Sequence, residues 1–160
     1  MDHVTNLQRD LIEEFGSIYE SYGLERVKGL ITGLLLTRSE ALSLDEIATL
    51  LGRSKGPVST AARALAEIGV LRKVNGPVNR RDYYVAHPDI FFNNFKHNMA
   101  IVRKNRRTAE QFLREFTSGS DEANQAAVPH LEHMLSFYSL MEGFYASFSE
   151  RWESERLSKR

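Results

Sequence analysis

The sequence predicts a mainly α-helical fold that contains one small β-hairpin. Apolar residues recur every three or four positions over most of the 160 residues, which is the period of amphipathic helices. Between residues 70 and 85 this period gives way to two short β-rich runs on either side of an Asn75-Gly76-Pro77 turn. A chain of this length fits a single domain, so we expect residues 1–160 to form one structural unit.

The first two expected helices lie near the N-terminus. Over residues 4–22, apolar residues spaced three or four apart share one helix face: Val4, Leu7, Leu11, Phe15, Ile18 and Tyr22. Gly23 supplies the stop for this helix. Residues 25–37 carry a more uniformly apolar set, Val27, Leu30, Ile31, Leu34 and Leu35, which predicts a second and more deeply buried helix.

Two shorter helices follow, joined by a tight turn. Ser43 can cap the first of them while Glu46 reaches back to the cap, and Gly52 supplies a left-handed stop. Ser54 then opens the second helix. Pro57 falls in the first turn of that helix, where its missing N–H would have had no intrahelical partner, so it does not break the helix.

The second of these helices has two different faces. Its inward stripe consists of Val58, Ala61, Leu65 and Ile68. Its outward residues are Lys55, Ser59, Thr60 and Arg63, and the small residues Gly56 and Ala62 permit close approach to whatever the helix faces. The pattern therefore predicts a helix that packs on one side and offers polar groups on the other.

The hairpin and two long helices complete the chain. Arg80 and Arg81 make the end of the hairpin basic, and the helix pair followed by this hairpin is the arrangement called a winged helix-turn-helix. From Pro88 a helical period continues to about residue 118, and a last helix begins near Asp121 or at Pro129. That last helix carries a wide aromatic stripe, which is typical of a terminal helix that meets a second surface.

Positive charge is concentrated in one part of a chain that is neutral overall. The 21 basic and 21 acidic residues give a formal net charge of zero. Seven basic residues and only one acid, Glu67, lie between Arg53 and Arg81, a local charge of +6. Such a field attracts phosphate whatever the total charge, although a solvated face is the plainer explanation of a charge run.

These observations together predict an interface for double-stranded DNA. The second helix of the turn fits the major groove, and the basic hairpin can enter the adjacent minor groove. The candidate DNA-binding residues are Ser54, Lys55, Gly56, Ser59, Thr60, Arg63, Lys73, Asn79, Arg80 and Arg81. A winged-helix module that only assembles proteins is the alternative, but it would have no reason to keep cations on both the helix and the hairpin.

The sequence resembles the MarR superfamily, and within it the GbsR-type branch. The motifs that carry the resemblance are Ser43-Leu44-Asp45-Glu46-Ile47-Ala48, Ser54-Lys55-Gly56-Pro57-Val58-Ser59, Leu65-Ala66-Glu67-Ile68-Gly69-Val70-Leu71 and Arg80-Arg81-Asp82-Tyr83-Tyr84. The resemblance implies a homodimeric repressor on a pseudo-palindromic operator, often relieved by a small-molecule effector. It divides the chain into a DNA-binding region, 25–87, and helical dimerisation regions, 1–24 and 88–160.

The hairpin of residues 70–85, which we call the wing, departs from the superfamily pattern at one position. MarR-type wings commonly place an aspartate just before the minor-groove arginine, where it braces the guanidinium as an ion pair. Asn79 occupies that position in this sequence, and its neutral amide can form hydrogen bonds but cannot form an ion pair with an arginine. The resemblance therefore leaves open which of Arg80 and Arg81 enters the groove.

Other functions are disfavoured by what the sequence lacks. With no cysteine and no nucleotide-binding or hydrolase motif, we expect neither an enzyme nor a cofactor. His130 and His133 stand three apart with Glu132 between them, but a metal-dependent sensor would need a further ligand that no motif supplies, so we expect no metal site. The absence of a long apolar run or a signal peptide favours a cytoplasmic protein without a membrane partner.

Overall fold

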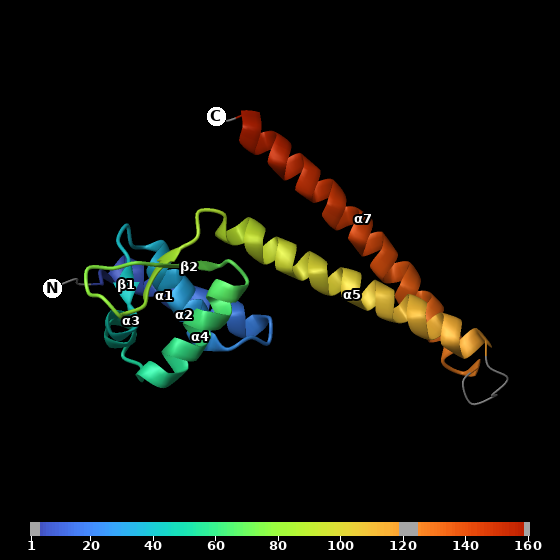
Figure 1. Cartoon of the computed structure of the whole chain (residues 1–160), viewed down its shortest axis with the longest axis horizontal. Helices are drawn as coiled ribbons and strands as arrows, with labels where there is room; N and C mark the ends of the chain where they lie inside the picture. The colour runs from blue at the N-terminus through green and yellow to red at the C-terminus, as the bar shows by residue number, and fades with distance from the viewer. Residues whose placement is uncertain (1–3, 119–124, 159–160) are drawn as a thin grey trace. The chain divides into compact units, whose positions relative to one another are not determined.

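The computed structural model describes residues 4–118 and 125–158, and Figure 1 shows its elements. In chain order these are α1 (Asn6–Ser21), α2 (Arg26–Leu36), β1 (Leu42–Ser43), α3 (Leu44–Leu51), α4 (Lys55–Glu67), β2 (Leu71–Val74), β3 (Tyr83–Ala86), α5 (Ile90–Ser118) and α7 (Val128–Ser158). The chain forms two compact units, the first ending at Asn94 and the second beginning at Phe95. The mainly α fold with a small antiparallel sheet confirms the predicted fold class.

The wing is part of a three-stranded antiparallel sheet in the order β1-β3-β2. Strands β2 and β3 form the predicted hairpin, in which Leu71 is opposite Ala86 and Val74 is opposite Tyr83. Strand β1 adds the pair Leu42 with Tyr84, a pairing that we did not predict because a strand of two residues has no visible period. This third strand fixes the base of the wing beside the start of α3.

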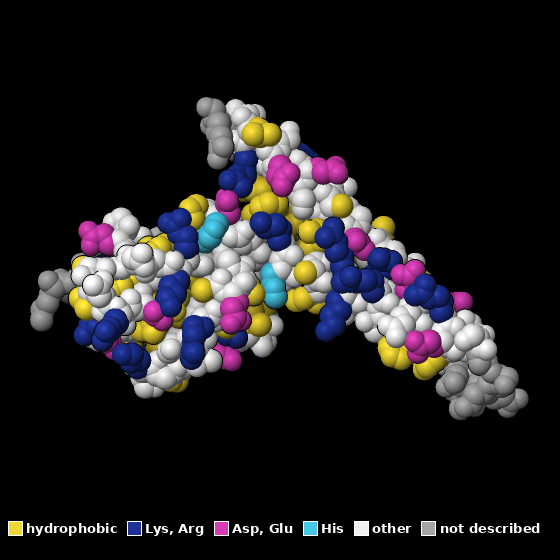
Figure 2. All heavy atoms as spheres, in the orientation of Figure 1, with side chains coloured by type: hydrophobic (Ala, Val, Ile, Leu, Met, Phe, Trp, Pro, Cys, Tyr) yellow, Lys and Arg dark blue, Asp and Glu magenta, His cyan; other side chains and the backbone are white. Residues whose placement is uncertain are grey.

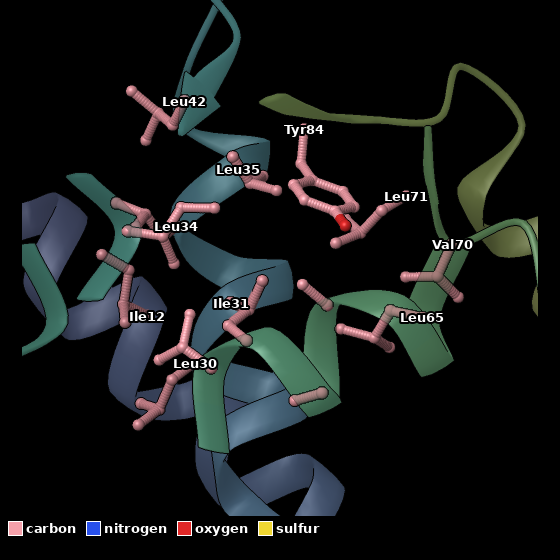
Figure 3. Close-up of a cluster of buried hydrophobic side chains, with 14 of the residues drawn as sticks. Ile12, Leu30, Ile31, Leu34, Leu35, Leu42, Leu65, Val70, Leu71 and Tyr84 are labelled. Atoms are coloured by element: carbon pink, nitrogen blue, oxygen red, sulfur yellow. The ribbon is translucent and has the colours of Figure 1, made fainter. Parts of the chain in front are cut away.

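Helix α2 lies at the centre of the first unit. Its residues 29–35 are all buried, in agreement with the prediction of a deeply buried helix. Figure 3 shows Ile31 and Leu35 of α2 in one apolar cluster with Leu65 of α4 and Tyr84 of β3. Because each of these side chains is at most 2% exposed, α4 and the sheet are held by a shared apolar core.

Helices α1 and α2 approach each other very closely. A Cβ atom added at Gly29 would lie 2.2 Å from the carbonyl oxygen of Phe15, and one at Gly33 would lie 2.9 Å from the Cα atom of Ile12. The buried face of α1 is formed by Ile12 and Gly16. Only glycine allows two helix backbones to come this close.

The predicted apolar stripe of α1 is not its buried face. Leu7 and Tyr22 are 79% and 77% exposed, and Leu11 and Ile18 are also exposed. Most of the predicted stripe is therefore exposed, although Val4 is buried and Phe15 is half-buried. The period correctly identified an apolar face, but the close contact with α2 uses the neighbouring face, where a glycine stands.

The second unit pairs the long helix α5 with α7. Phe95 stacks on Tyr145 with ring centroids 4.5 Å apart and contacts Phe148 at 4.6 Å. Further along, Arg106 Nε donates to Glu142 at 2.6 Å and Arg103 Nε donates to the same carboxylate at 3.1 Å. These contacts show that the two helices are antiparallel. Helix α7 begins at Val128, and Asp121, the other start that we considered, lies outside the described residues.

The contact between α1 and α2 predicts an unusual effect of an alanine substitution. Gly29→Ala should lower the free energy of unfolding by about 1–3 kcal/mol, because the new methyl group would meet backbone atoms that cannot move aside. In an uncrowded helix interior the same change stabilises by up to about 1 kcal/mol. Gly143→Ala in α7 is the control, since no described atom lies within 4 Å of its added Cβ. Urea unfolding that shows Gly29→Ala to be as stable as wild type would contradict this packing.

The capping box of α3 predicts a pH dependence of stability. The Glu46 carboxylate accepts hydrogen bonds from the Ser43 hydroxyl at 2.6 Å and from the Ser43 N–H at 2.7 Å, and these bonds hold the pKa of Glu46 below its ordinary value. Its contribution to stability is therefore present above the ordinary pKa of about 4.3 and is lost as pH falls through the lowered folded-state pKa.

The measurement compares wild type with Glu46→Gln, whose amide oxygen can still accept from the cap. Urea midpoints taken from pH 7 to pH 3 should show the wild type more stable near neutrality, with the difference shrinking below about pH 4. A difference that stays constant over this range would show that the Glu46 charge does not contribute.

Candidate nucleic-acid interface

The turn between α3 and α4 is built by local signals. Ser43 caps α3 with Glu46 as its reciprocal partner, and Gly52 ends the helix at φ +60°, as predicted. The N–H of Arg53 then donates to Ala48 O at 2.9 Å. Ser54 stands at the N-cap position of α4, but its side chain accepts from no N–H of α4 in the described structure. The first turn of α4 therefore offers N–H groups that suit an anion.

Helix α4 presents a polar face opposite its core contacts. Lys55, Thr60 and Arg63 are exposed and Ser59 is half-buried. Of the predicted inward residues, Val58, Ala61 and Leu65 are at most 1% exposed, and Ile68 is half-buried against the same core. The polar face predicted from the sequence is therefore accessible.

The two small residues of α4 have different positions. A Cβ added at Gly56 would meet no described atom within 4 Å, so this part of the helix is open to a close partner. Ala62 is completely buried in the core. Our expectation that Ala62 lines the outward face was wrong, because the apolar core covers more of the helix surface than a stripe of every third or fourth residue.

The wing loop between β2 and β3 has a defined shape. A Cβ added at Gly76 would lie 2.0 Å from the ring of Tyr83, so the loop backbone lies directly on this ring. Arg80 adopts a left-handed backbone conformation with φ +69°. Lys73 and Asp82, at the two ends of the loop, form an ion pair at 2.7 Å. The hydrogen bond to Asp82 raises the pKa of Lys73 above its ordinary value.

The wing arginines Arg80 and Arg81 lie beside both helix α4 and strand β2. A hollow of about 330 Å³ is lined by Ser43, Leu44, Asp45, Lys55, Arg80, Arg81 and Asp82. A second hollow of about 720 Å³ is lined by Arg72, Lys73, Val74, Asn75, Arg80, Arg81 and Asp82. Because Arg80 and Arg81 line both, the structure brings them together with Lys55 at the start of α4.

Acidic side chains that we did not predict accompany this basic surface. Asp45 forms an ion pair with Lys55 at 2.7 Å. The hydrogen bond from Lys55 holds the pKa of Asp45 below its ordinary value, and the charges of Lys55 and Arg81 act in the same direction. Asp45 and Asp82 thus supply negative charge near the wing, which Asn79 cannot. For Asp45 the only signal in the sequence was its place in the first turn of α3.

The basic residues counted in the sequence are all accessible. Each of the seven between Arg53 and Arg81 is exposed. In Figure 2 dark-blue Lys and Arg side chains gather on the part of the first unit where Figure 1 draws α3 and α4. Arg63 Nε donates to Ser59 O, 3.3 Å away on the preceding turn of α4, so its guanidinium lies along the outward face. The geometry joins a polar helix face and a basic wing into one surface.

Other candidate sites do not assemble to the same degree. Among residues 4–118 and 125–158, no group of three or more histidines, cysteines or acids is placed to hold a metal ion, and His130 and His133 are exposed. Two arginines of α5, Arg103 and Arg106, are paired with Glu142 of α7. In the described part of the chain, no helix is both long and apolar enough to span a membrane.

Comparison with known proteins gives matches over about half of the chain. No family model matches. The chain is 35% identical over 83 residues to HTH-type transcriptional regulator MmpR5 of Mycobacterium tuberculosis, covering 51% of this chain and 50% of that protein. It is 33% identical over 90 residues to HTH-type transcriptional repressor GbsR of Bacillus subtilis, covering 54% and 49%. The chain thus spans about half the length of the curated relatives it matches.

A solved structure matches over nearly the whole chain. It is described as a transcriptional regulator, is 25% identical, and aligns with a TM-score of 0.77 over 92% of this chain and 98% of its own. The fold is therefore that of a solved regulator, and about half of the chain is similar in sequence to named HTH-type regulators. The chain has a winged helix-turn-helix fold, and the comparisons confirm the predicted resemblance to GbsR over about half of the chain.

Proposed function

We propose that this chain is a sequence-specific DNA-binding transcriptional regulator that acts without catalysis in the cytoplasm. The observation that carries the proposal is the continuous surface formed by the polar face of α4 and the two wing arginines, which share a hollow with Lys55. The similarity of about half of the chain to HTH-type regulators supports it. Because GbsR is named a repressor, repression is the mode of action that we propose.

Helix α4 is the element that we place in the major groove. Arg63 is exposed on its outward face and can make a bidentate contact with guanine, while Ser59 and Thr60 can reach bases or phosphates. Lys55, with the uncapped first turn beginning after Ser54, suits a phosphate oxygen. The open space at Gly56 lets the sugar-phosphate backbone approach the helix closely.

The wing is the element that we place in the minor groove. Arg80 and Arg81 lie in the loop between β2 and β3 and are exposed, so either can enter a narrow groove with a strongly negative potential. Asn79 can donate a hydrogen bond to a base edge or phosphate. Lys73, a further candidate, must exchange its contact with Asp82 for one with DNA, or share the two.

We further propose that two copies of the chain form a homodimer on a pseudo-palindromic operator. The DNA-binding region is 25–87, and the dimerisation regions are 1–24 and 88–160. Each unit carries exposed apolar side chains: Leu7 on α1 and Tyr22 at its C-terminal end, and Leu140 and Phe144 on α7, the last two 78% and 67% exposed. Apolar faces of this kind mark protein interfaces. Release by a small-molecule effector completes the proposal.

Two recognition helices would then contact half-sites about 34 Å apart, one turn of DNA. Arg63→Ala should weaken binding to the preferred DNA by about 1–3 kcal/mol and relax the base preference at one position of each half-site, because a bidentate contact with one base is lost. Arg114→Ala, which removes an exposed arginine of α5, is the control for the loss of charge. A footprinting titration in which Arg63→Ala keeps both affinity and preference would remove Arg63 from the base contacts.

The wing gives a separate prediction about salt. Replacing Arg80 and Arg81 by alanine should reduce the magnitude of the slope of log affinity against log salt concentration by roughly 1–2, because fewer counterions are released on binding. The measurement is a titration of fluorescent duplex DNA at several salt concentrations. An unchanged slope would place the wing outside the interface.

A further inference from the structure

The C-terminal end of α4 is attached to the first turn of α5 by one side chain. Asn93 Nδ2 donates to the carbonyl oxygen of Gly69 at 2.8 Å and lies 3.0 Å from His87 Nδ1. Gly69 O is an acceptor, so the amide nitrogen of Asn93, and not its oxygen, must face it. The contact joins residues that are 24 positions apart in the sequence.

His87 adds a second contact between the end of α4 and the segment that leads into α5. Its Nδ1 accepts from the backbone N–H of Asp89 at 2.9 Å, and Asn93 Nδ2 lies 3.0 Å from the same ring nitrogen. The backbone N–H of His87 donates to Val70 O at 3.0 Å. Two adjacent carbonyls, those of Gly69 and Val70, are therefore both bound by the segment that leads into α5.

The turn that ends α4 is shaped to receive Asn93. Gly69 has φ +74°, and a Cβ added there would lie 2.9 Å from Asn93 Nδ2. The N–H groups of Gly69 and Val70 close the helix by donating to Ala66 O at 3.1 Å and Leu65 O at 2.9 Å. The glycine is thus required both by its backbone conformation and by the side chain lying over it.

We infer that Asn93 is a positioning residue for DNA recognition, which fixes the end of α4 to α5 and thereby sets the direction of the recognition helix. This inference rests on the proposed DNA-binding function. Helix α4 has 13 residues, so it is about 18 Å long, and a tilt of about 5° at its C-terminal end would move its N-terminal end by about 1.6 Å. Hydrogen bonds to base edges tolerate only a few tenths of an ångström.

The expected defect is therefore one of selectivity. Contacts with phosphate and with the minor groove come from long, mobile side chains such as Lys55, Arg80 and Arg81, and these can follow a displaced backbone. Base contacts from α4 cannot, because they need both distance and direction. Loss of the Asn93 contact should weaken binding to the preferred sequence and leave binding to unrelated DNA nearly as it was.

The test compares Asn93→Ala and Asn93→Asp with the matched control Asn94→Ala, an exposed neighbour on the same helix. The aspartate variant keeps the shape of the side chain but cannot donate to Gly69 O, so it separates the hydrogen bond from packing. Affinities for DNA that the wild type enriches from a random pool, and for unrelated duplex DNA, are measured well below the unfolding temperature of each variant. We expect the ratio of the two affinities to fall at least fivefold in both Asn93 variants and to stay unchanged in Asn94→Ala.

If folded Asn93→Asp has the same ratio of affinities for preferred and unrelated DNA as the wild type, the inference about Asn93 is overturned, but the proposed DNA-binding function is not. A wild type that binds all DNA equally would instead contradict the proposed function. Amide hydrogen exchange provides a readout that needs no DNA: the amides of Ile68, Gly69 and Val70 should exchange faster in Asn93→Asp than in wild type. Unchanged protection at these amides would show that Asn93 does not hold the end of α4, and would equally overturn the inference.

Discussion

The burial of one face of α4 against α2 decides which residues of the helix are left exposed for the proposed contact with DNA. Val58 of α4 and Ile31 of α2 are inaccessible to solvent, and Leu65 is 1% exposed. Each such side chain contributes roughly 1.5–3 kcal/mol when it leaves water, far more than an exposed ion pair. The core thus fixes the rotation of α4, and the polar residues on its other side, such as Arg63, are exposed as a consequence.

Electrostatics then acts on a surface that the core has already arranged. The chain is neutral as a whole, yet the seven basic residues between Arg53 and Arg81 are all exposed. Asp45 forms an ion pair with Lys55, and Asp82 forms one with Lys73, each with an Nζ–Oδ1 distance of 2.7 Å. Exposed pairs of this kind contribute little to stability, so their main effect is to orient lysine side chains before a polyanion arrives.

Features that depend on neighbouring residues could be predicted from the sequence. Ser43 and Glu46 form their capping box and Gly52 ends α3 because each signal is complete within one turn. Features that depend on a distant partner could not. The buried face of α1 follows from glycines on α2, strand β1 exists only because Tyr84 pairs with Leu42, and the arginines of α5 meet an acid 36 and 39 positions away. The attachment of Asn93 to Gly69 belongs to the same class.

The central claim is that two copies of this surface read a two-fold symmetric DNA sequence. The most direct measurement is selection of binding sites from a pool of random duplex DNA by the purified wild-type protein, followed by sequencing. The account predicts enrichment of two inverted half-sites whose centres are about 10 base pairs apart. A pool that is not enriched after repeated rounds, or that yields only single half-sites without symmetry, would contradict it.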